Sequence, residues 1–159
     1  MKIAVACDHA GFPLKSTVLD AVREAGYEMI DLGTYDADPV DYPDLADKLG
    51  RAIQSGQVER GILLCGSGVG ASIAANKLHG IYAGVCHDTY SAHQGVEHDD
   101  MNVLCIGARV VGPEPAREII QAYLKARFVG NDPGQERHKR RVNKVRAMEN
   151  RMGGVDGGK

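Results

Sequence analysis

The sequence predicts an α/β fold with three layers, and three observations predict it. Short β-branched runs alternate with amphipathic stretches along the chain. Within those runs apolar residues follow one another, as they do in strands that are buried on both faces. The 159 residues suit one compact domain. Because strand–helix–strand alternation places parallel strands between helices, we expect a Rossmann-like α/β/α sandwich around a five-stranded parallel sheet, with a C-terminal helical extension.

The predicted elements come in a regular order. Strands are expected over 2–7, 28–32, 60–65, 81–86 and 103–107, where short apolar runs occur. Helices are expected over about 12–25, 43–55, 70–77, 89–98 and 113–126. In the first helix, apolar residues recur at three- and four-residue steps from Leu14 to Ala25. Gly26 follows as the predicted C-terminal cap.

The end of the chain differs from the core. Residues 129–135 are rich in turn formers and separate a core over 1–128 from a basic tail over 129–159 of the same domain. Beyond the break, Val142, Val145, Met148 and Met152 fall at helical steps. The core offers this stripe little surface within its own chain, so we predict a helix that packs partly on a second subunit. Residues 153–159 are predicted to fray.

Composition and charge exclude several classes of protein. Apolar residues are 43% and charged residues 25% of the chain, which excludes wholesale disorder. The formal net charge of −2 gives no general attraction to nucleic acid, although residues 136–151 hold seven Lys or Arg against two Glu. That basic segment indicates an anionic ligand or an acidic partner surface. No apolar run reaches the roughly 18 residues of a membrane span, and Asp8 and His9 interrupt the N-terminal run, so we expect a cytoplasmic protein.

The four cysteines do not form a metal-binding pattern. None is spaced as C-x-x-C, and no paired Cys/His spacing occurs, so neither structural zinc nor another metal or cofactor is expected. Cys7, Cys86 and Cys105 are predicted to be buried, reduced thiols. Cys65 requires separate treatment because of the glycines that follow it.

The first candidate for chemistry is the segment Cys7-Asp8-His9-Ala10-Gly11, which ends the first strand. Ligands of open parallel sheets bind outside the carboxyl ends of the strands. Two interpretations stay open here. Asp8 could cap the following helix with His9 in a loop, or both side chains could line a pocket.

The second candidate is the loop Cys65-Gly66-Ser67-Gly68-Val69-Gly70. Three alternate glycines between a buried strand and a helix place backbone N–H groups around a concavity that suits a phosphate or an oxyanion. The loop is not G-x-G-x-x-G, because Ala71 stands at the last position, and it is not a P-loop. Helix-terminal N–H groups facing Cys65 would favour its thiolate as a base or nucleophile. The alternative is a core cysteine before a structural turn.

The third candidate is His98, at the end of the helix predicted over 89–98. We expect it to point at the same sheet edge as Cys65. A cysteine and a histidine there would allow nucleophilic catalysis, as in a hydrolase, or proton transfer on a bound substrate. His79, His87 and His93 are predicted to have solvated or local structural roles.

Taken in order, five segments resemble the type B ribose-5-phosphate isomerases, the family that also contains the galactose-6-phosphate isomerases. They are CDHAGFPLK, DYPD, CGSGVGASIAANK, YSAH with EHDDMNVLCIGARVVG, and RHKRRV. The resemblance runs from about residue 1 to 150. It implies a metal-independent enzyme that interconverts an aldose phosphate and its ketose isomer through an enediol or enediolate. Ribose 5-phosphate and ribulose 5-phosphate are the expected pair.

The resemblance also implies roles for single residues. Cys65 matches the base that moves a proton between C2 and C1, Ser67 a proton relay between O1 and O2, and His98 the acid that opens the furanose ring. Backbone N–H groups of the glycine loop would stabilise the enediolate. The implied substrate contacts are Asp8, His9, Tyr42, Gly66, Gly68, Val69, Gly70 and Asp99.

The resemblance further implies that phosphate binds to Arg109, Arg137 and Arg141. In the family the tail arginines come from the neighbouring subunit, which implies a homodimer or tetramer with shared active sites. Arg137 and Arg141 are four residues apart, so on a helix they share a face. Asp99 departs from the asparagine that is common in the family, and an ionised carboxylate cannot donate hydrogen bonds. The segment FVGNDPGQE is also longer than usual.

Other functions remain open from the sequence. The substrate could be allose 6-phosphate, galactose 6-phosphate or a tetrose phosphate, because pocket depth is invisible in the sequence. A cysteine hydrolase would use Cys65 and His98. A non-catalytic binder of phosphosugars or nucleic acid would use the basic tail, although the chain has no Trp and is only 5% aromatic.

Overall fold

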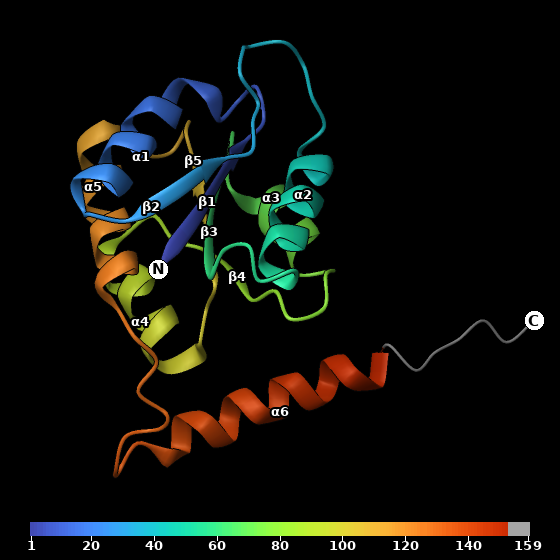
Figure 1. The fold of residues 1–159 in the computed structure, drawn as a ribbon, viewed down its shortest axis with the longest axis vertical. Coiled ribbons are helices and arrows are strands. Elements are labelled where there is room, and N and C mark those ends of the chain that lie inside the picture. Colours follow the sequence, from blue (N-terminus) through green and yellow to red (C-terminus); the bar gives the residue numbers. More distant parts are fainter. Residues whose placement is uncertain (153–159) are drawn as a thin grey trace, which may run out of the picture.

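A computed structural model describes residues 1–152 and shows one parallel sheet between two layers of helices (Figure 1). The strand order is β2-β1-β3-β5-β4. This confirms the predicted sandwich and its five parallel strands. The strands are β1 (Lys2–Cys7), β2 (Glu28–Asp31), β3 (Arg60–Cys65), β4 (Ala83–Val85) and β5 (Val103–Gly107).

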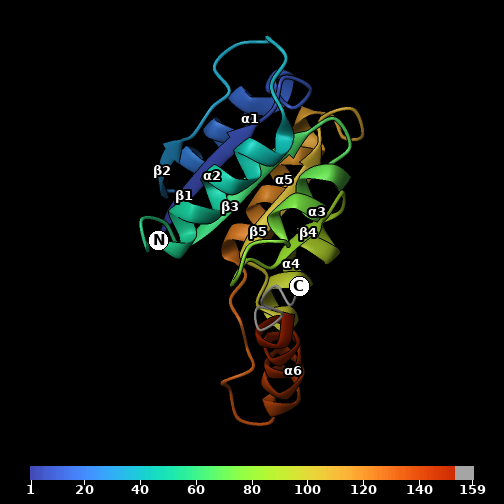
Figure 2. The ribbon, with the colours of Figure 1, turned by 90° about the vertical axis from the view of Figure 1, so that its right-hand side faces the viewer.

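The helices divide between the two faces of the sheet (Figure 2). One face carries α1 (Phe12–Glu24), α4 (Thr89–Asp99) and α5 (Pro113–Lys125), and the other carries α2 (Tyr42–Gln54) and α3 (Val69–Ala75). Side chains of β1 alternate between these layers, since Ile3 and Val5 join the first core cluster and Ala4 and Ala6 the second. The buried strands are therefore continuously apolar in sequence, as expected for a parallel sheet.

Most predicted boundaries agree with the structure to within one or two residues, and Gly26 ends α1 with φ of +79° as predicted. The fourth strand is the exception, because it is shorter than the predicted 81–86. At the start of β4, asparagine side chains, and not a neighbouring strand, accept hydrogen bonds from the backbone N–H groups. The Tyr82 N–H donates to Asn102 Oδ1, and the Ala83 N–H donates to Asn76 Oδ1, both at 2.8 Å.

The basic tail forms α6 (Glu136–Met152), which lies across the amino-terminal edge of the sheet and extends away from the body (Figure 1). Val142 is buried within its own chain, so the prediction that the stripe finds little surface there is wrong for this residue. Val145 and Met148 remain 51% and 56% exposed. Packing on a second subunit stays a prediction, and the predicted fraying of 153–159 lies outside the described residues.

Polar contacts of two residues, Arg146 and Glu149, hold the middle and end of α6 against the core. Arg146 pairs with Asp100 at 2.5 Å. Glu149 accepts hydrogen bonds from the Gly80 N–H at 2.7 Å and the Tyr82 hydroxyl at 3.0 Å. Among the helices of residues 1–152, none combines the length and the apolarity needed to cross a membrane.

Candidate active site

The turns after β1 and β3 flank the point where the strand order reverses. From β1 the chain passes to β2 on one side, whereas β3 is followed by β5 and β4 on the other. The two turns are in direct contact, since the Asp8 N–H donates to the Leu64 carbonyl at 3.1 Å. Ligands of doubly wound sheets bind at such a switch point. Two of the three predicted segments therefore meet where a ligand is expected.

The thiol of Cys65 faces the start of α3, as predicted. The Gly68 N–H donates to Cys65 Sγ at 2.9 Å, and Cys65 is only 5% exposed. Gly68 has φ of +82°, a left-handed conformation in which glycine has no steric penalty. A backbone donor and the positive end of a helix both stabilise negative charge on sulfur. The structure thus places the Cys65 sulfur at the end of β3 and in contact with a backbone donor.

Close packing fixes the shape of the glycine loop. A Cβ atom at Gly107 would lie 2.6 Å from the backbone carbonyl of Ser67, and one at Gly70 would lie 2.9 Å from the ring of Tyr42. The loop is thus pressed between the end of β5 and the first residue of α2. Any side chain at these glycines would move the loop or the ring.

The outer rim of the loop carries polar side chains from the predicted set. Ser67 is exposed, and its Oγ accepts from the Val69 N–H at 3.2 Å, which leaves its hydroxyl hydrogen free to donate. The exposed Arg109 lies over Gly66, since a Cβ there would be 3.6 Å from its Nε. Cys65, Ser67, Arg109 and Tyr42 are thereby brought together.

The side chains of Asp8 and His9 both contact the backbone. The Asp8 carboxylate is buried and accepts from the Gly11 N–H at 2.8 Å, so it closes the turn that leads into α1. His9 Nδ1 lies 3.3 Å from both the N and the O of Val40. These contacts agree with the structural interpretation of Asp8, and they place His9 between the β1 turn and the loop that precedes α2.

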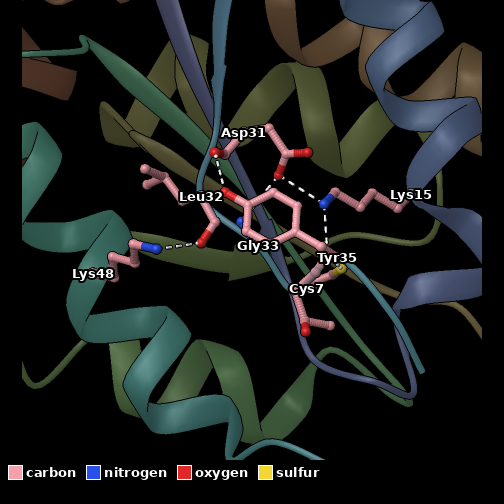
Figure 3. A network of polar contacts seen from close by, with 8 residues as sticks. Cys7, Lys15, Asp31, Leu32, Gly33, Tyr35 and Lys48 are labelled. Atoms are coloured by element: carbon pink, nitrogen blue, oxygen red, sulfur yellow. Dashed lines mark hydrogen bonds and ion pairs between the residues drawn. The ribbon is translucent and has the colours of Figure 1, made fainter. Parts of the chain in front are cut away.

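A buried lysine anchors the other end of that loop (Figure 3). Lys15 Nζ lies 2.7 Å from Asp31 Oδ1 and donates to the Thr34 carbonyl at 2.6 Å. The ammonium also lies 4.5 Å from the centroid of the Tyr35 ring. Lys48 from α2 donates to the Leu32 carbonyl at 2.8 Å. The loop is therefore tied to α1 and α2 before it reaches Tyr42.

The other three cysteines are buried, as predicted. Burial raises the pKa of Cys7 and that of Cys86 to about 11. Burial also raises the pKa of Cys105, more strongly. These thiols stay protonated at neutral pH, and Cys65 differs from them in its contact with a backbone N–H.

The prediction that His98 points at the same sheet edge as Cys65 is wrong within one chain. Helix α4 runs antiparallel to the strands, so its last turn lies at the amino-terminal edge, where β5 begins. Cys65 pairs with Gly107 at the other end of β5, and five strand residues span about 16 Å. A cysteine hydrolase that uses both residues of one chain is therefore not supported.

His98 instead belongs to a cluster with the start of α6, which also includes Asp99, Arg137 and Arg141. Arg137 and Arg141 are exposed and one turn apart. The ring of His98 stacks on that of His138, with centroids 4.0 Å apart. A cavity of about 670 Å³ lies nearby, between the core and the second half of α6. Predicted catalytic and phosphate-binding residues thus lie at both edges of the sheet.

Sequence reasoning missed two contacts of the candidate sites. His87 Nε2 accepts from the Gly107 N–H at 2.9 Å, so this imidazole supports the end of β5 against which the glycine loop packs. Its position directly after β4 was the available signal. The stack of His138 on His98 joins residues 40 positions apart and has no local signature. Among residues 1–152, no group of three or more His, Cys, Asp or Glu side chains could hold a metal ion.

Comparison with known proteins identifies the family of this chain. A family model described as Ribose/Galactose Isomerase matches residues 3–145. The chain is 47% identical over 150 residues to ribose-5-phosphate isomerase B of Escherichia coli (strain K12), covering 94% of this chain and 97% of the relative. It is 46% identical over 134 residues to D-erythrulose-4-phosphate isomerase of Pectobacterium atrosepticum, covering 82% and 86%.

A solved structure shows the same fold. The Clostridium thermocellum ribose-5-phosphate isomerase B superposes with a TM-score of 0.89 at 45% identity, over 96% of this chain and 99% of that one. The fold and the matches define an enzyme of the sugar-phosphate isomerase class. The chain belongs to the ribose/galactose isomerase family.

Proposed function

We propose that this enzyme interconverts ribose 5-phosphate and ribulose 5-phosphate through an enediolate. The observation that carries the proposal is the hydrogen bond from the Gly68 N–H to Cys65 Sγ, at the switch point between β1 and β3. Aldose–ketose isomerisation needs a base beside a site that stabilises an oxyanion, and the thiol and the glycine loop meet that need.

In the proposed reaction the Cys65 thiolate removes the proton from C2 of the open-chain aldose. The electrons move to the C1 oxygen, and loop N–H groups stabilise the resulting enediolate. Ser67 relays a proton between O1 and O2, for which its hydroxyl hydrogen is free. The protonated thiol then returns a proton to C1 and gives the ketose. Binding of the remote phosphate supplies energy for positioning the carbonyl end.

The proposed site is complete only with a second copy of the chain. His98 is assigned the opening of the furanose ring: it protonates the ring oxygen as the C1–O bond breaks, and the C1 hydroxyl releases its proton to water to become the aldehyde. Because His98 and Cys65 of one chain lie at opposite edges of the sheet, a sugar phosphate cannot reach both. We infer that His98, Asp99, Arg137 and Arg141 act on the substrate at Cys65 of another subunit.

Mixing two impaired variants, assayed at ribose 5-phosphate concentrations well below KM, tests this shared site. Cys65→Ala and the double variant Arg137→Ala, Arg141→Ala each damage every site of a homodimer. After random reassortment, half of the dimers are mixed, and one of their two sites is intact, so about a quarter of the wild-type activity should return. Mass spectrometry shows whether mixed dimers have formed. If they have formed and activity does not recover, the proposal that two subunits share each active site is contradicted.

The substrate is tested by proton exchange in D2O with a panel of aldose 5- and 6-phosphates, followed by NMR. Deuterium entering C1 or C2 of ribose 5-phosphate or ribulose 5-phosphate, and of no other pair at a comparable rate, is the expected result. Selective exchange in allose or galactose 6-phosphate would replace the assigned substrate within the same chemistry. Absence of exchange in every sugar would leave a phosphosugar binder.

A four-carbon sugar phosphate is the second candidate. The observation that favours it is the 46% identity to a relative named D-erythrulose-4-phosphate isomerase. A tetrose phosphorylated at O4 has no free hydroxyl with which to close a five-membered ring, so its isomerisation needs no ring-opening acid. Including erythrose 4-phosphate in the panel separates the candidates, and a His98→Asn variant that converts it normally but loses ribose 5-phosphate would mark His98 as the ring-opening group.

A further inference from the structure

His138 is a buried imidazole to which the proposed reaction gives no task. It lies in the first turn of α6 and is only 3% exposed. Its ring stacks on that of His98, with the centroids 4.0 Å apart and the planes inclined by 19°. Within residues 1–152, no hydrogen-bond partner lies near its buried Nε2. A buried polar atom without a partner lowers stability, so its retention needs a reason.

The surroundings of His138 keep it neutral. Burial lowers its pKa below the ordinary value of 6.5, and the charges of His98, Arg137 and Arg141 lower it further. Asp99 acts in the opposite direction. The facing groups thus come from both packed elements, His98 and Asp99 from α4 and the two arginines from α6.

The contacts of His98 show what the stack adds. Its Nδ1 lies 3.0 Å from Gln94 Nε2, and its Nε2 lies 3.4 Å from Glu97 Oε2. Both neighbours belong to α4, the helix that carries His98 itself. His138 covers a face of the ring from α6, while 31% of the His98 side chain stays exposed. The contact with His138 therefore restricts the orientation of the His98 ring and of its exposed edge.

We propose that His138 is a positioning residue for His98: the stacked imidazole holds the His98 ring in the orientation that delivers a proton to the ring oxygen of a cyclic sugar phosphate. The inference rests on the ring-opening role proposed for His98. It assigns His138 no contact with substrate and no proton transfer. Its effect is confined to the ring-opening step and leaves the enediolate chemistry at Cys65 untouched.

The test compares a step that needs ring opening with one that does not. Conversion of ribose 5-phosphate begins from a furanose. Ribulose 5-phosphate has no free hydroxyl that can close a five-membered ring, so deuterium exchange at its C1 reports only the enediolate chemistry. His138→Ala should lower kcat for ribose 5-phosphate about 10- to 100-fold, since small errors in orientation have effects of that size. Exchange into ribulose 5-phosphate should stay within about twofold of wild type.

Two further variants separate orientation from general damage. His138→Phe keeps a buried aromatic ring on His98 and should restore ribose 5-phosphate conversion to within about threefold of wild type. His79→Ala is the control. His79 is an exposed imidazole beside Glu149 at the other end of α6, and its removal should change neither rate. Three outcomes would overturn the proposal. In His138→Ala, both rates could fall equally or neither could fall. Alternatively, His138→Phe could be as slow as His138→Ala. A wild-type enzyme that exchanges ketose protons but converts no cyclic aldose would overturn the proposed ring-opening function itself.

Discussion

At the carboxyl edge of the sheet, the candidate site is made largely of backbone. Its glycine loop lies between β5 and Tyr42, and the Cys65 thiol meets a main-chain N–H. At the amino-terminal edge, the second cluster consists of side chains on helix ends, with Arg137 and Arg141 exposed. The first region depends on close packing within one chain, whereas the second presents charge outward.

This difference separates two kinds of sensitivity. A backbone-built site is disturbed by any atom that moves the loop, because its donors cannot be adjusted one at a time. A surface cluster tolerates rearrangement, but each lost cation removes a direct contact with an anion. Substitutions at the carboxyl edge should therefore affect mainly kcat, and those of the exposed arginines at the amino-terminal edge mainly KM.

Removing the thiol should have the largest effect. Cys65→Ala is expected to lower kcat for ribose 5-phosphate by at least about 10³-fold, since general-base catalysis contributes factors of this order. Phosphosugar binding measured by calorimetry should remain nearly unchanged. Cys105→Ala removes a buried thiol from the neighbouring strand and should keep most activity. Normal turnover in Cys65→Ala would remove Cys65 as the base.

A single methyl group should have the next largest effect. Gly107→Ala places a Cβ 2.6 Å from the Ser67 carbonyl, and displacing the loop should lower kcat about 10²-fold. Gly112→Ala is the matched control, because nothing lies within 4 Å of its Cβ position. Steady-state kinetics and a crystal structure of the variant check this. Comparable rates in the two variants would contradict the importance of the loop position.

The amino-terminal edge should respond in KM. Arg137→Ala combined with Arg141→Ala is expected to raise KM for ribose 5-phosphate about tenfold or more, with a smaller change in kcat, because hydrogen bonds to a charged phosphate are lost. Lys144→Ala removes a positive charge further along α6 and serves as the control. An unchanged KM in the double variant would move the phosphate site away from α6.

Alkaline pH should affect stability through two buried thiols of the carboxyl edge, since Cys7 ends β1 and Cys86 follows β4. The pKa values of Cys7 and Cys86 are raised from 9.0 to about 11, so between these pH values the unfolded chain releases protons that the folded chain retains. The free energy of unfolding should therefore fall as pH rises from 9 to 11, by about 2 kcal/mol for each of the two thiols. Urea titrations of wild type and Cys7→Ala check this, and equal slopes in both would contradict the assignment to Cys7.

Local patterns predicted the carboxyl edge well. The order of apolar runs and glycines was sufficient for the strands, and Cys65 meets the N–H of Gly68 as expected from a strand–loop–helix segment. His98 was misplaced because a position before a strand was treated as equivalent to a position after one. The start of β4 depends on the side chains of Asn76 and Asn102. The stack of His138 on His98 depends on where α6 lies, which no local pattern determines.

The anchors of the loop before α2 have a consequence for changing this enzyme. Lys15 and Asp31 fasten its beginning, His9 meets Val40 near its end, and residues 35–39 between them are exposed. An insertion within 35–39 would lengthen an exposed loop whose two ends stay anchored. Variation in length there would alter the segment that leads to the contact with His9 and to Tyr42, and it would leave the glycine loop unchanged. Residues 35–39 are thus a natural starting point for libraries of variants designed to alter substrate preference.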